Sequence, residues 1–382
     1  MATDVRPGNT IQITRDTSFG STNDVLIDNI GSIAVDDLGR VYFTSGVSNG
    51  IHIFESDGHY LKQIGRKGRG PGEFTAAYPA LYIISTRVYA IDLLAYRANV
   101  FSVDSLRLIR TVNINPTTNI KSLADNYIHQ VIPVKDGTFL VSLKKFLHEV
   151  PELSEGTKID NLYQRYYPMD KDGRLIPKQV FKIQDQPVVT ESIYQEVFPV
   201  SLHFFSKPLV AISDEGAVYV ANSKDFLIKE YSLDGEYQRA FFHPFQNVSL
   251  NRKTALESSY DTMNNMRKFL SGEGKRDNMI QSLINISQRT IRQIDLPSSW
   301  PALDNMMIDD ENRLWISTIV EDFDIYEWWV LEETGELITR FEWPRDEPIE
   351  VVKNGYMYTR ETDEVTGLQQ VVRYRVEMTE AE

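Results

Sequence analysis

The sequence contains no cysteine among its 382 residues. Disulfide bonds, thiol nucleophiles and cysteine-ligated zinc or iron–sulfur centres are therefore excluded. It also lacks any run of about 18 uncharged apolar residues, so no segment is expected to span a membrane as a helix. What remains is ordinary globular composition, with 42% hydrophobic and 25% charged residues.

Basic residues are fewer than acidic residues in this chain. The 40 Lys and Arg residues stand against 54 Asp and Glu residues, which gives a net charge of −14. A surface this acidic is repelled by a phosphate backbone, so nucleic acid is not expected as a partner.

One pattern of short segments recurs six times along the chain. In its first copy, Ile33-Ala-Val-Asp-Asp-Leu-Gly39 is followed by Val41-Tyr-Phe43, which makes an apolar stretch, an acidic turn ending in glycine and a second apolar stretch. Further copies lie at 131–141, 210–220 and 306–316, and weaker ones at 81–91 and 350–358. Asp-Gly and Asn-Gly pairs between β-rich runs favour tight hairpins.

Each copy continues into a second hairpin, as at Asp57-Gly58 and Asp234-Gly235. Two hairpins make a four-stranded antiparallel unit, and such units at a spacing of about 45 residues are typical of a β-propeller. We therefore predict a single six-bladed β-propeller domain over residues 1–382. The last unit has only three strands, so the strand at 10–14 is expected to complete it and close the ring.

The chain resembles the NHL-like six-bladed β-propellers that are common among uncharacterised bacterial proteins. The resemblance rests on residues 33–39, on Ile51-His-Ile-Phe54 with Asp57-Gly58, and on the glycine-rich loop 64–74. Blade two departs from the family because Ser85-Thr86 replaces the glycine turn. The resemblance implies an exported protein, periplasmic or extracellular after signal removal. The first ten residues contain no apolar signal segment, and the cytoplasm stays open as the alternative.

Because the strands of a blade alternate in direction, the connections between them lie on two opposite rims of the propeller. The tight turns join strands one to two and three to four, so they share one rim, and all other connections must lie on the opposite rim. The long connections are of the second kind, at 65–78, 115–128, 146–161, 184–205 and 245–300. Long loops on a rigid scaffold usually carry function, so this decorated rim is the predicted binding surface for a small molecule, peptide or protein.

The longest connection contains a helical pattern at about 248–294. Apolar residues recur there at spacings of three and four, namely Leu256, Tyr260, Met263, Met266 and Leu270, and then Met279, Leu283 and Ile286. We expect two helices, either covering the channel mouth as a lid or packed on the blade edge as fixed decoration.

Six polar residues precede the innermost strands and are expected to face the central channel: Asn29, His129, His203, Asp304, Asn305 and Glu350. Oxygen ligands of this kind suit a divalent cation such as Ca²⁺. Six-bladed lactonase-like enzymes place acidic and Asn ligands at this location, and by this resemblance Glu350, Asp304 and Asn305 would hold the ion, with His129 or His203 as base. The alternative is that these groups hydrogen-bond one another and channel water.

The loop 65–74 combines glycines with Arg66, Lys67 and Arg69. Successive amides in a glycine-rich turn can form an anion-binding nest, to which Arg66 and Arg69 would add positive charge. The alternative is a structural connection between blades in which Glu73 pairs with one arginine.

All five tryptophans lie between Trp300 and Trp343. Strand alternation places Trp328 and Trp329 on opposite faces of blade five, and both faces of a blade are buried against neighbours. Packing in the core is therefore favoured over an exposed aromatic platform.

These patterns favour a ligand- or protein-binding propeller that uses the decorated rim and channel mouth, without demonstrable catalysis. One alternative is the metal-dependent hydrolase, acting on a lactone or ester. A second alternative is a structural interaction scaffold that needs no channel ligand.

Overall fold

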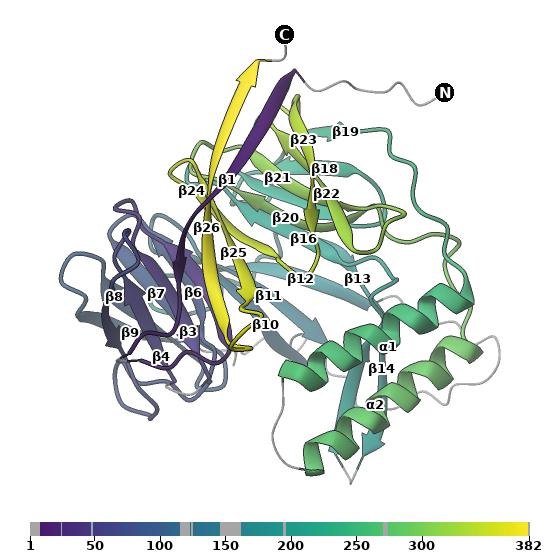
Figure 1. Cartoon of the computed structure of the whole chain (residues 1–382), viewed down its shortest axis with the longest axis horizontal. Helices are drawn as coiled ribbons and strands as arrows, with labels where there is room; N and C mark the ends of the chain where they lie inside the picture. Colours follow the sequence, from purple (N-terminus) through teal and green to yellow (C-terminus); the bar gives the residue numbers. More distant parts are fainter. Residues whose placement is uncertain are drawn as a thin grey trace.

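The chain folds into six four-stranded antiparallel sheets arranged as blades around a central channel (Figure 1). The computed structural model describes residues 8–23, 25–46, 49–114, 123, 125–145, 162–193, 196–269 and 274–380. The predicted six-bladed β-propeller with four-stranded blades is confirmed.

Five blades are built from consecutive strands. Blade one contains β2 (Ile30–Val35), β3 (Val41–Ser45), β4 (Gly50–Phe54) and β5 (Tyr60–Ile64), and blade two contains β6 (Ala80–Ile84), β7 (Arg87–Asp92), β8 (Arg97–Ser102) and β9 (Leu108–Asn113). Blade three contains β10 (Asn126–Pro133), β11 (Phe139–Lys145), β12 (Leu162–Met169) and β13 (Phe181–Asp185). Blade four contains β16 (Pro208–Ile212), β17 (Val218–Asn222), β18 (Leu227–Tyr231) and β19 (Tyr237–Phe242), and blade five contains β20 (Leu303–Ile308), β21 (Leu314–Ile319), β22 (Ile325–Leu331) and β23 (Leu337–Pro344).

Blade six combines the two ends of the chain. It contains β24 (Ile349–Lys353), β25 (Tyr356–Thr362) and β26 (Gln369–Glu380), and its outer strand is β1 (Asn9–Phe19). β1 runs antiparallel to β26 from the pair Asn9–Glu380 to the pair Phe19–Val371. Both termini therefore leave the ring from the same blade (Figure 1).

The tight turns lie where the acidic-glycine pairs predict them. Gly39 has a φ of 76° and Gly216 a φ of 89°, in the left-handed region that glycine adopts without steric cost. In blade two, Ser85 takes a φ of 54° without a glycine. The hairpin therefore forms there despite the departure from the repeat pattern.

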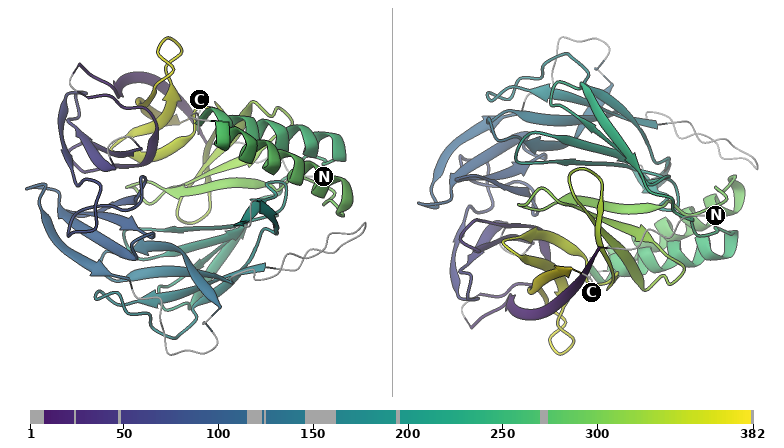
Figure 2. Two further views of the ribbon diagram at one scale, coloured as in Figure 1. Left: turned by 90° about the horizontal axis from the view of Figure 1, so that it is seen from below. Right: turned by 90° about the horizontal axis from the view of Figure 1, so that it is seen from above.

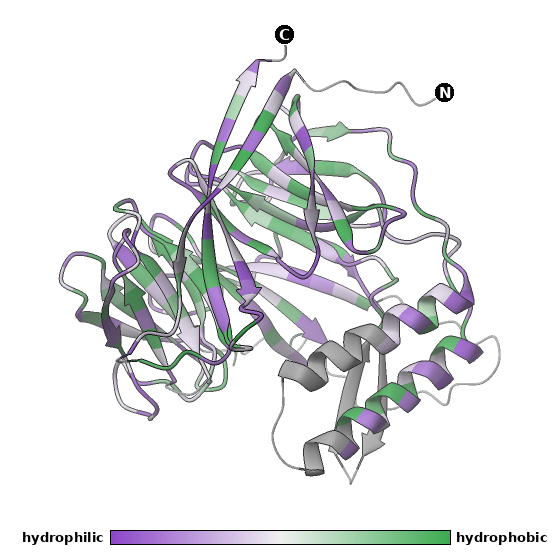
Figure 3. Ribbon diagram, viewed as in Figure 1, coloured by the Kyte–Doolittle hydropathy of each residue, from purple (hydrophilic) through white to green (hydrophobic). Residues whose placement is uncertain are grey.

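The blades pack face to face through apolar side chains, which appear as green segments along the strands in Figure 3. Trp329 packs toward blade four, with its ring 5.0 Å from that of Phe226. Trp328 packs on the other face with Ile349 of blade six. The prediction that both tryptophans belong to the core is confirmed.

Two insertions project from the ring beside blades four and five (Figures 1 and 2). The helices α1 (Arg252–Phe269) and α2 (Gly274–Gln293) connect blade four to blade five, where the sequence predicts them. The strands β14 (Val188–Ile193) and β15 (Glu196–Ser201) form a separate hairpin that contacts α2. This hairpin was not predicted, because the segment 184–205 was expected to be a loop.

A buried carboxylate organises the first turn of blade one. Asp36 Oδ1 accepts hydrogen bonds from the amides of Leu38 and Arg40, at 2.9 Å each. Its Oδ2 accepts bonds from Arg40 Nε at 2.7 Å and from the Tyr42 hydroxyl at 2.9 Å. Arg40 also donates to the Val103 carbonyl of blade two, so the cluster joins two blades.

Blade five repeats the arrangement. Asp309 accepts from the amides of Glu311 and Arg313, from Arg313 Nε and from Trp315 Nε1. An acidic residue followed four residues later by Arg and six residues later by an aromatic donor is therefore a structural signature of this turn.

Replacing the buried carboxylate is expected to destabilise the propeller. The Asp36→Asn variant places an amide nitrogen against Arg40 and leaves that guanidinium without its ion pair, so the free energy of unfolding should fall by about 3 kcal/mol in urea denaturation. The matched control is Asp37→Asn, because the Asp37 side chain is 74% exposed and its ion pair with Lys353 lies at the surface. Its effect should stay below about 1 kcal/mol. Equal effects of the two variants would show that the Asp36 cluster contributes no more than a surface pair.

Candidate functional site

The two mouths of the channel differ in what surrounds them. The inner strands of the six blades are β2, β6, β10, β16, β20 and β24. We call the end where these strands begin the entry mouth, and the end where they pass into the tight turns the turn mouth. The helices lead from β19 into the start of β20, so they belong to the entry mouth, which corresponds to the predicted decorated rim.

A first polar cluster spans blades four and five at the entry mouth. Lys207 Nζ lies 3.1 Å from Asp304 Oδ1, which joins residues 97 positions apart in the sequence. The hydroxyl of Tyr326 faces the same carboxylate, and burial together with Asp304 raises the pKa of Tyr326. His203 lies beside this pair. The surrounding protein and Lys207 lower the pKa of His203, although its side chain is exposed and Asp304 opposes the shift.

Arg345 connects this cluster to the insertion. Its guanidinium carbon lies 4.3 Å from the centre of the Tyr326 ring and 5.0 Å from that of Phe323, and Nε donates to the Ile325 carbonyl at 2.8 Å. Both rings pack against an apolar cluster formed by α1, α2 and neighbouring connections, which includes Ala255 and Ile284. The described part of the insertion is thus anchored on blade five.

A second cluster belongs to blade three. Lys144 Nζ lies 2.8 Å from Asp185 Oδ2, and the Asp185 side chain is almost fully buried. Asp185 Oδ1 also accepts from Gln164 Nε2 at 3.2 Å. His129 lies beside the pair and is exposed. Enclosure by protein and the charge of Lys144 lower the pKa of His129, against the opposing effect of Asp185.

A third cluster spans blades six and one. Glu350 is paired with Arg360, and burial raises the pKa of Glu350 while Arg360 opposes that shift. In blade one, Asp28 accepts from the Ser45 hydroxyl at 3.2 Å and from Asn29 Nδ2 at 3.5 Å. The three clusters together give the entry mouth fixed groups of both signs.

Each of the predicted metal ligands already has a partner within the protein. Asp304 is paired with Lys207 and Glu350 with Arg360, while Asn305 Oδ1 accepts from the amide of Met306 at 2.9 Å. Within the described ranges, no three His, Asp or Glu side chains are grouped closely enough to hold an ion. The ligand set Glu350, Asp304 and Asn305 therefore gains no support from the geometry.

The channel itself contains a cavity of about 570 Å³ lined by all six inner strands. Among the six channel residues named from the sequence, Asn305 and Glu350 line it, whereas Asn29, His129, His203 and Asp304 do not. The lining continues to Asp214 and Asp310 at the turn mouth. The cavity therefore extends from the entry mouth to the turn mouth.

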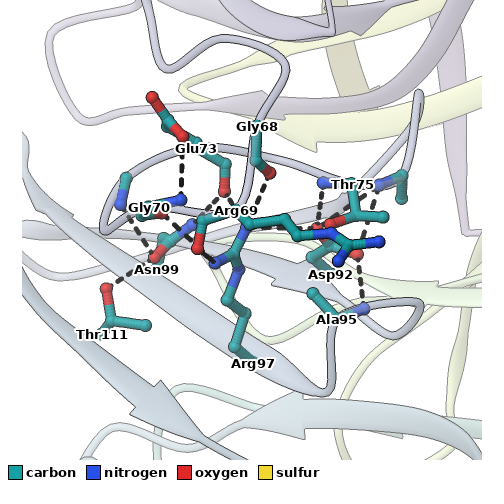
Figure 4. Close-up of polar contacts among 12 residues, drawn as sticks. Gly68, Arg69, Gly70, Glu73, Thr75, Asp92, Ala95, Arg97, Asn99 and Thr111 are labelled. Carbon is teal, nitrogen blue, oxygen red and sulfur yellow. Dashed lines mark hydrogen bonds and ion pairs between the residues drawn. The ribbon is translucent and has the colours of Figure 1, made fainter.

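The glycine-rich loop 65–74 is built around a buried arginine from blade two (Figure 4). Arg97 Nη1 donates to the carbonyls of Arg69 at 2.7 Å and Gly70 at 3.2 Å, and Nη2 donates to those of Gly68 at 3.2 Å and Glu73 at 2.6 Å. Four carbonyls of one loop thus converge on a single guanidinium.

The loop amides are engaged as well. Gly68 donates to the Phe74 carbonyl, Gly70 to Glu73 Oε2 and Gly72 to Asn99 Oδ1. The prediction that these amides form an anion-binding nest with Arg66 and Arg69 is wrong, because their donors are already used within the protein. The structural interpretation is confirmed: Glu73 pairs with Arg66 at 2.9 Å, and the Gly70 amide and Arg66 lower the pKa of Glu73.

His243 does not contribute to the described site. His243 is buried between blades four and five, where Nε2 lies 2.9 Å from the Gly335 carbonyl and the ring contacts Phe226 and Trp329. His148 lies outside the described residues.

Comparisons with known proteins agree with the fold. Residues 19–195 match the model of the family DUF5128, described as a 6-bladed beta-propeller. No curated protein is similar to the chain in sequence. Neither helix in the described part of the chain is long and apolar enough to cross a membrane.

Several solved structures resemble the chain at low sequence identity. A member of the DUF4221 family from Bacteroides vulgatus shares 10% identity, with 98% of this chain and 100% of that chain covered and a TM-score of 0.51. A putative exported protein from Bacteroides fragilis shares 10% identity over 98% of both chains, with a TM-score of 0.48. Regucalcin, a calcium-binding protein from Agrobacterium tumefaciens, shares 10% identity over 94% of this chain and 95% of that chain, with a TM-score of 0.41. At sequence identities of about 10%, these similarities show a common propeller fold and nothing about function.

Removing the arginine that organises the loop is expected to destabilise the protein. Arg97→Gln removes the buried guanidinium and leaves four carbonyls of the loop without their charged donor, so the unfolding free energy in urea should fall by about 3 kcal/mol. Arg66→Gln is the matched control in the same loop, because its side chain is 79% exposed, and its effect should stay below about 1 kcal/mol. A rise of the melting temperature with inorganic phosphate that disappears in Arg66→Gln would contradict the structural role and restore the anion nest.

Proposed function

We propose that the chain is a ligand-binding propeller that holds a small polar molecule at the entry mouth. The observation that carries this proposal is the set of three ion-pair clusters at that mouth. The first belongs to blade three, the second to blades four and five, and the third to blades six and one. They are centred on the pairs Lys144–Asp185, Lys207–Asp304 and Arg360–Glu350.

The balance of charge indicates the kind of ligand. Each cluster contains a cation and an acid, so the mouth offers hydrogen-bond donors and acceptors with little net charge. A molecule that carries both donors and acceptors, such as a zwitterion or a polyhydroxyl compound, complements such a surface better than a polyanion does. The imidazoles of His129 and His203, whose pKa values are lowered, add ring nitrogens that can donate or accept.

Rigidity supports the same function. The polar side chains lie at the entry-mouth ends of strands whose faces are buried between blades, so little ordering is needed when a ligand binds. Tyr326 and Arg345 are further fixed by the apolar packing of the insertion. A preorganised polar mouth of this kind suits selective binding without requiring chemistry.

The metal-dependent hydrolase is a weaker proposal for this site. A divalent ion would have to displace Lys207 from Asp304 and Arg360 from Glu350 before those carboxylates became ligands. The loss of both ion pairs would oppose binding of the ion.

The proposal predicts that a small polar ligand stabilises the protein through the entry mouth. Amino acids, dipeptides and sugars would be screened by thermal denaturation, and a compound that raises the melting temperature would be measured by calorimetry. Asp304→Asn should weaken its binding at least tenfold, because Lys207 and Tyr326 lose their charged partner. Glu257→Gln, which removes an exposed ion pair on α1, is the matched control and should leave the affinity unchanged.

Two results would contradict the proposal. One is a panel without any stabilising compound. The other is a Ca²⁺-dependent rise in melting temperature that is lost in Glu350→Gln, which would favour the metal-dependent hydrolase through linkage.

A further inference from the structure

Tyr78 adds an aromatic ring to the third polar cluster. We propose that this ring and the charged side chains around it bind a pyranose sugar, with an apolar face of the sugar on the ring and its hydroxyl groups on the charged groups. The inference rests on the proposed function, because it names the chemical class of the ligand for the same mouth.

Two glycines of blade one make room for the ring. Tyr78 lies in the connection from β5 to β6, which belongs to the entry mouth. A Cβ at Gly31 would lie 2.5 Å from Tyr78 Cδ1, and a Cβ at Gly46 would lie 2.2 Å from the Tyr78 hydroxyl oxygen. Both distances are far shorter than a van der Waals contact, so a side chain at either position would displace the ring. One side of Tyr78 therefore rests on the backbone of blade one.

The ring remains partly exposed to solvent. Tyr78 is 37% exposed, whereas Tyr42 in the core of blade one is fully buried. An aromatic ring supported on one side offers a large contact area and loses little freedom when a ligand binds. The C–H groups of a pyranose form an apolar face that can pack on such a ring.

Charged groups lie around this ring. Burial raises the pKa of Tyr78, the charge of Asp28 adds to the shift, and Arg360 opposes it. Both charges therefore lie close enough to Tyr78 to contact the same small molecule. Asp28 accepts from two neutral groups, the Ser45 hydroxyl at 3.2 Å and Asn29 Nδ2 at 3.5 Å. A carboxylate has about four acceptor positions, so Asp28 can also accept from sugar hydroxyls.

The ion pair of the cluster provides donors and acceptors together. The side chains of Arg360 and Glu350 are 25% and 26% exposed. A guanidinium has five N–H donors, so Arg360 can donate to a hydroxyl oxygen while it keeps its pair with Glu350. Hydrogen bonds to charged groups are stronger than those between neutral groups, which favours a ligand rich in hydroxyls.

The same arrangement favours a sugar over a zwitterion. The carboxylate of a zwitterion would compete with Glu350 for Arg360, whereas sugar hydroxyls bind without separating that pair. A small zwitterion such as glycine also lacks an apolar face to cover Tyr78. Of the two ligand classes that suit the entry mouth, the polyhydroxyl class in ring form therefore fits the third cluster.

The experiment compares the methyl pyranosides of glucose, galactose and mannose with sorbitol, an open-chain polyol, and with glycine. Binding to the full chain is measured by calorimetry and by saturation-transfer NMR. At least one pyranoside is expected to bind about tenfold more tightly than sorbitol and glycine, because only the ring presents a preformed apolar face.

Variants test the contribution of the ring. Tyr78→Ala should weaken binding of that pyranoside about tenfold, and Tyr78→Phe should retain most of the affinity because the ring remains. The matched control is Tyr237→Ala, which removes a 58% exposed tyrosine at the start of β19 and should leave the affinity unchanged. Asp28→Asn should weaken binding severalfold. Circular dichroism verifies folding, and Asp28→Asn keeps the test valid should Tyr78→Ala fail to fold.

Several results would overturn the inference. These are the absence of pyranoside binding, equal binding of sorbitol, and an affinity that is unchanged in a folded Tyr78→Ala variant. If no pyranoside binds but an amino acid does, with an affinity that falls in Asp304→Asn, the proposed function stands and only this inference fails. If no compound binds at all, both fail.

Discussion

The structure depends on the pairing of β1 with β26, which joins the two ends of the chain in one blade. Ile11 and Ile13 of β1 pack against the apolar cluster that also contains Trp315 and Trp328 of blade five. The same blade is bound to blade one, because the Ile30 amide donates to Gln369 Oε1 at 2.7 Å and Asn354 Nδ2 donates to the Asp36 carbonyl at 3.1 Å. The Glu350–Arg360 pair lies within blade six, and closing the ring sets that blade beside the start of blade one.

A closed ring leaves its two mouths as the places where polar side chains gather. The faces of the blades are occupied by apolar packing, so polar groups accumulate where strands begin and end, and each mouth acquires its own chemistry. At the entry mouth, acids and cations are paired in fixed clusters beside the helices. At the turn mouth, short acidic turns surround the opening of the channel.

The sequence predicts the blades well because their signals are local. An acidic-glycine pair specifies its own hairpin, and alternation along one strand is enough to place Trp328 and Trp329 on opposite faces. The signature shared by Asp36 and Asp309, with Arg and an aromatic donor at fixed spacings, was also readable from the sequence and was missed. The pairing of Lys207 with Asp304 was not predictable in this way, because it joins two blades and depends on their relative position. The cavity was not predictable either, because its extent depends on how six separate strands are placed around the channel. The β14–β15 hairpin was not predictable because its segment lacks the acidic-glycine turn of the repeat.

The most direct test of the closed ring uses the absence of cysteine from the chain. Thr10 and Thr379 face each other across β1 and β26, with their hydroxyl oxygens 2.9 Å apart. In the double variant Thr10→Cys with Thr379→Cys, we expect an intramolecular disulfide to form under mild oxidation and to raise the melting temperature relative to the reduced protein, since it links strands that are already paired. The pair Thr10→Cys with Met378→Cys, one position out of register, should crosslink poorly. Failure of the first pair to crosslink within one molecule, or crosslinking between molecules only, would contradict the closed six-bladed ring.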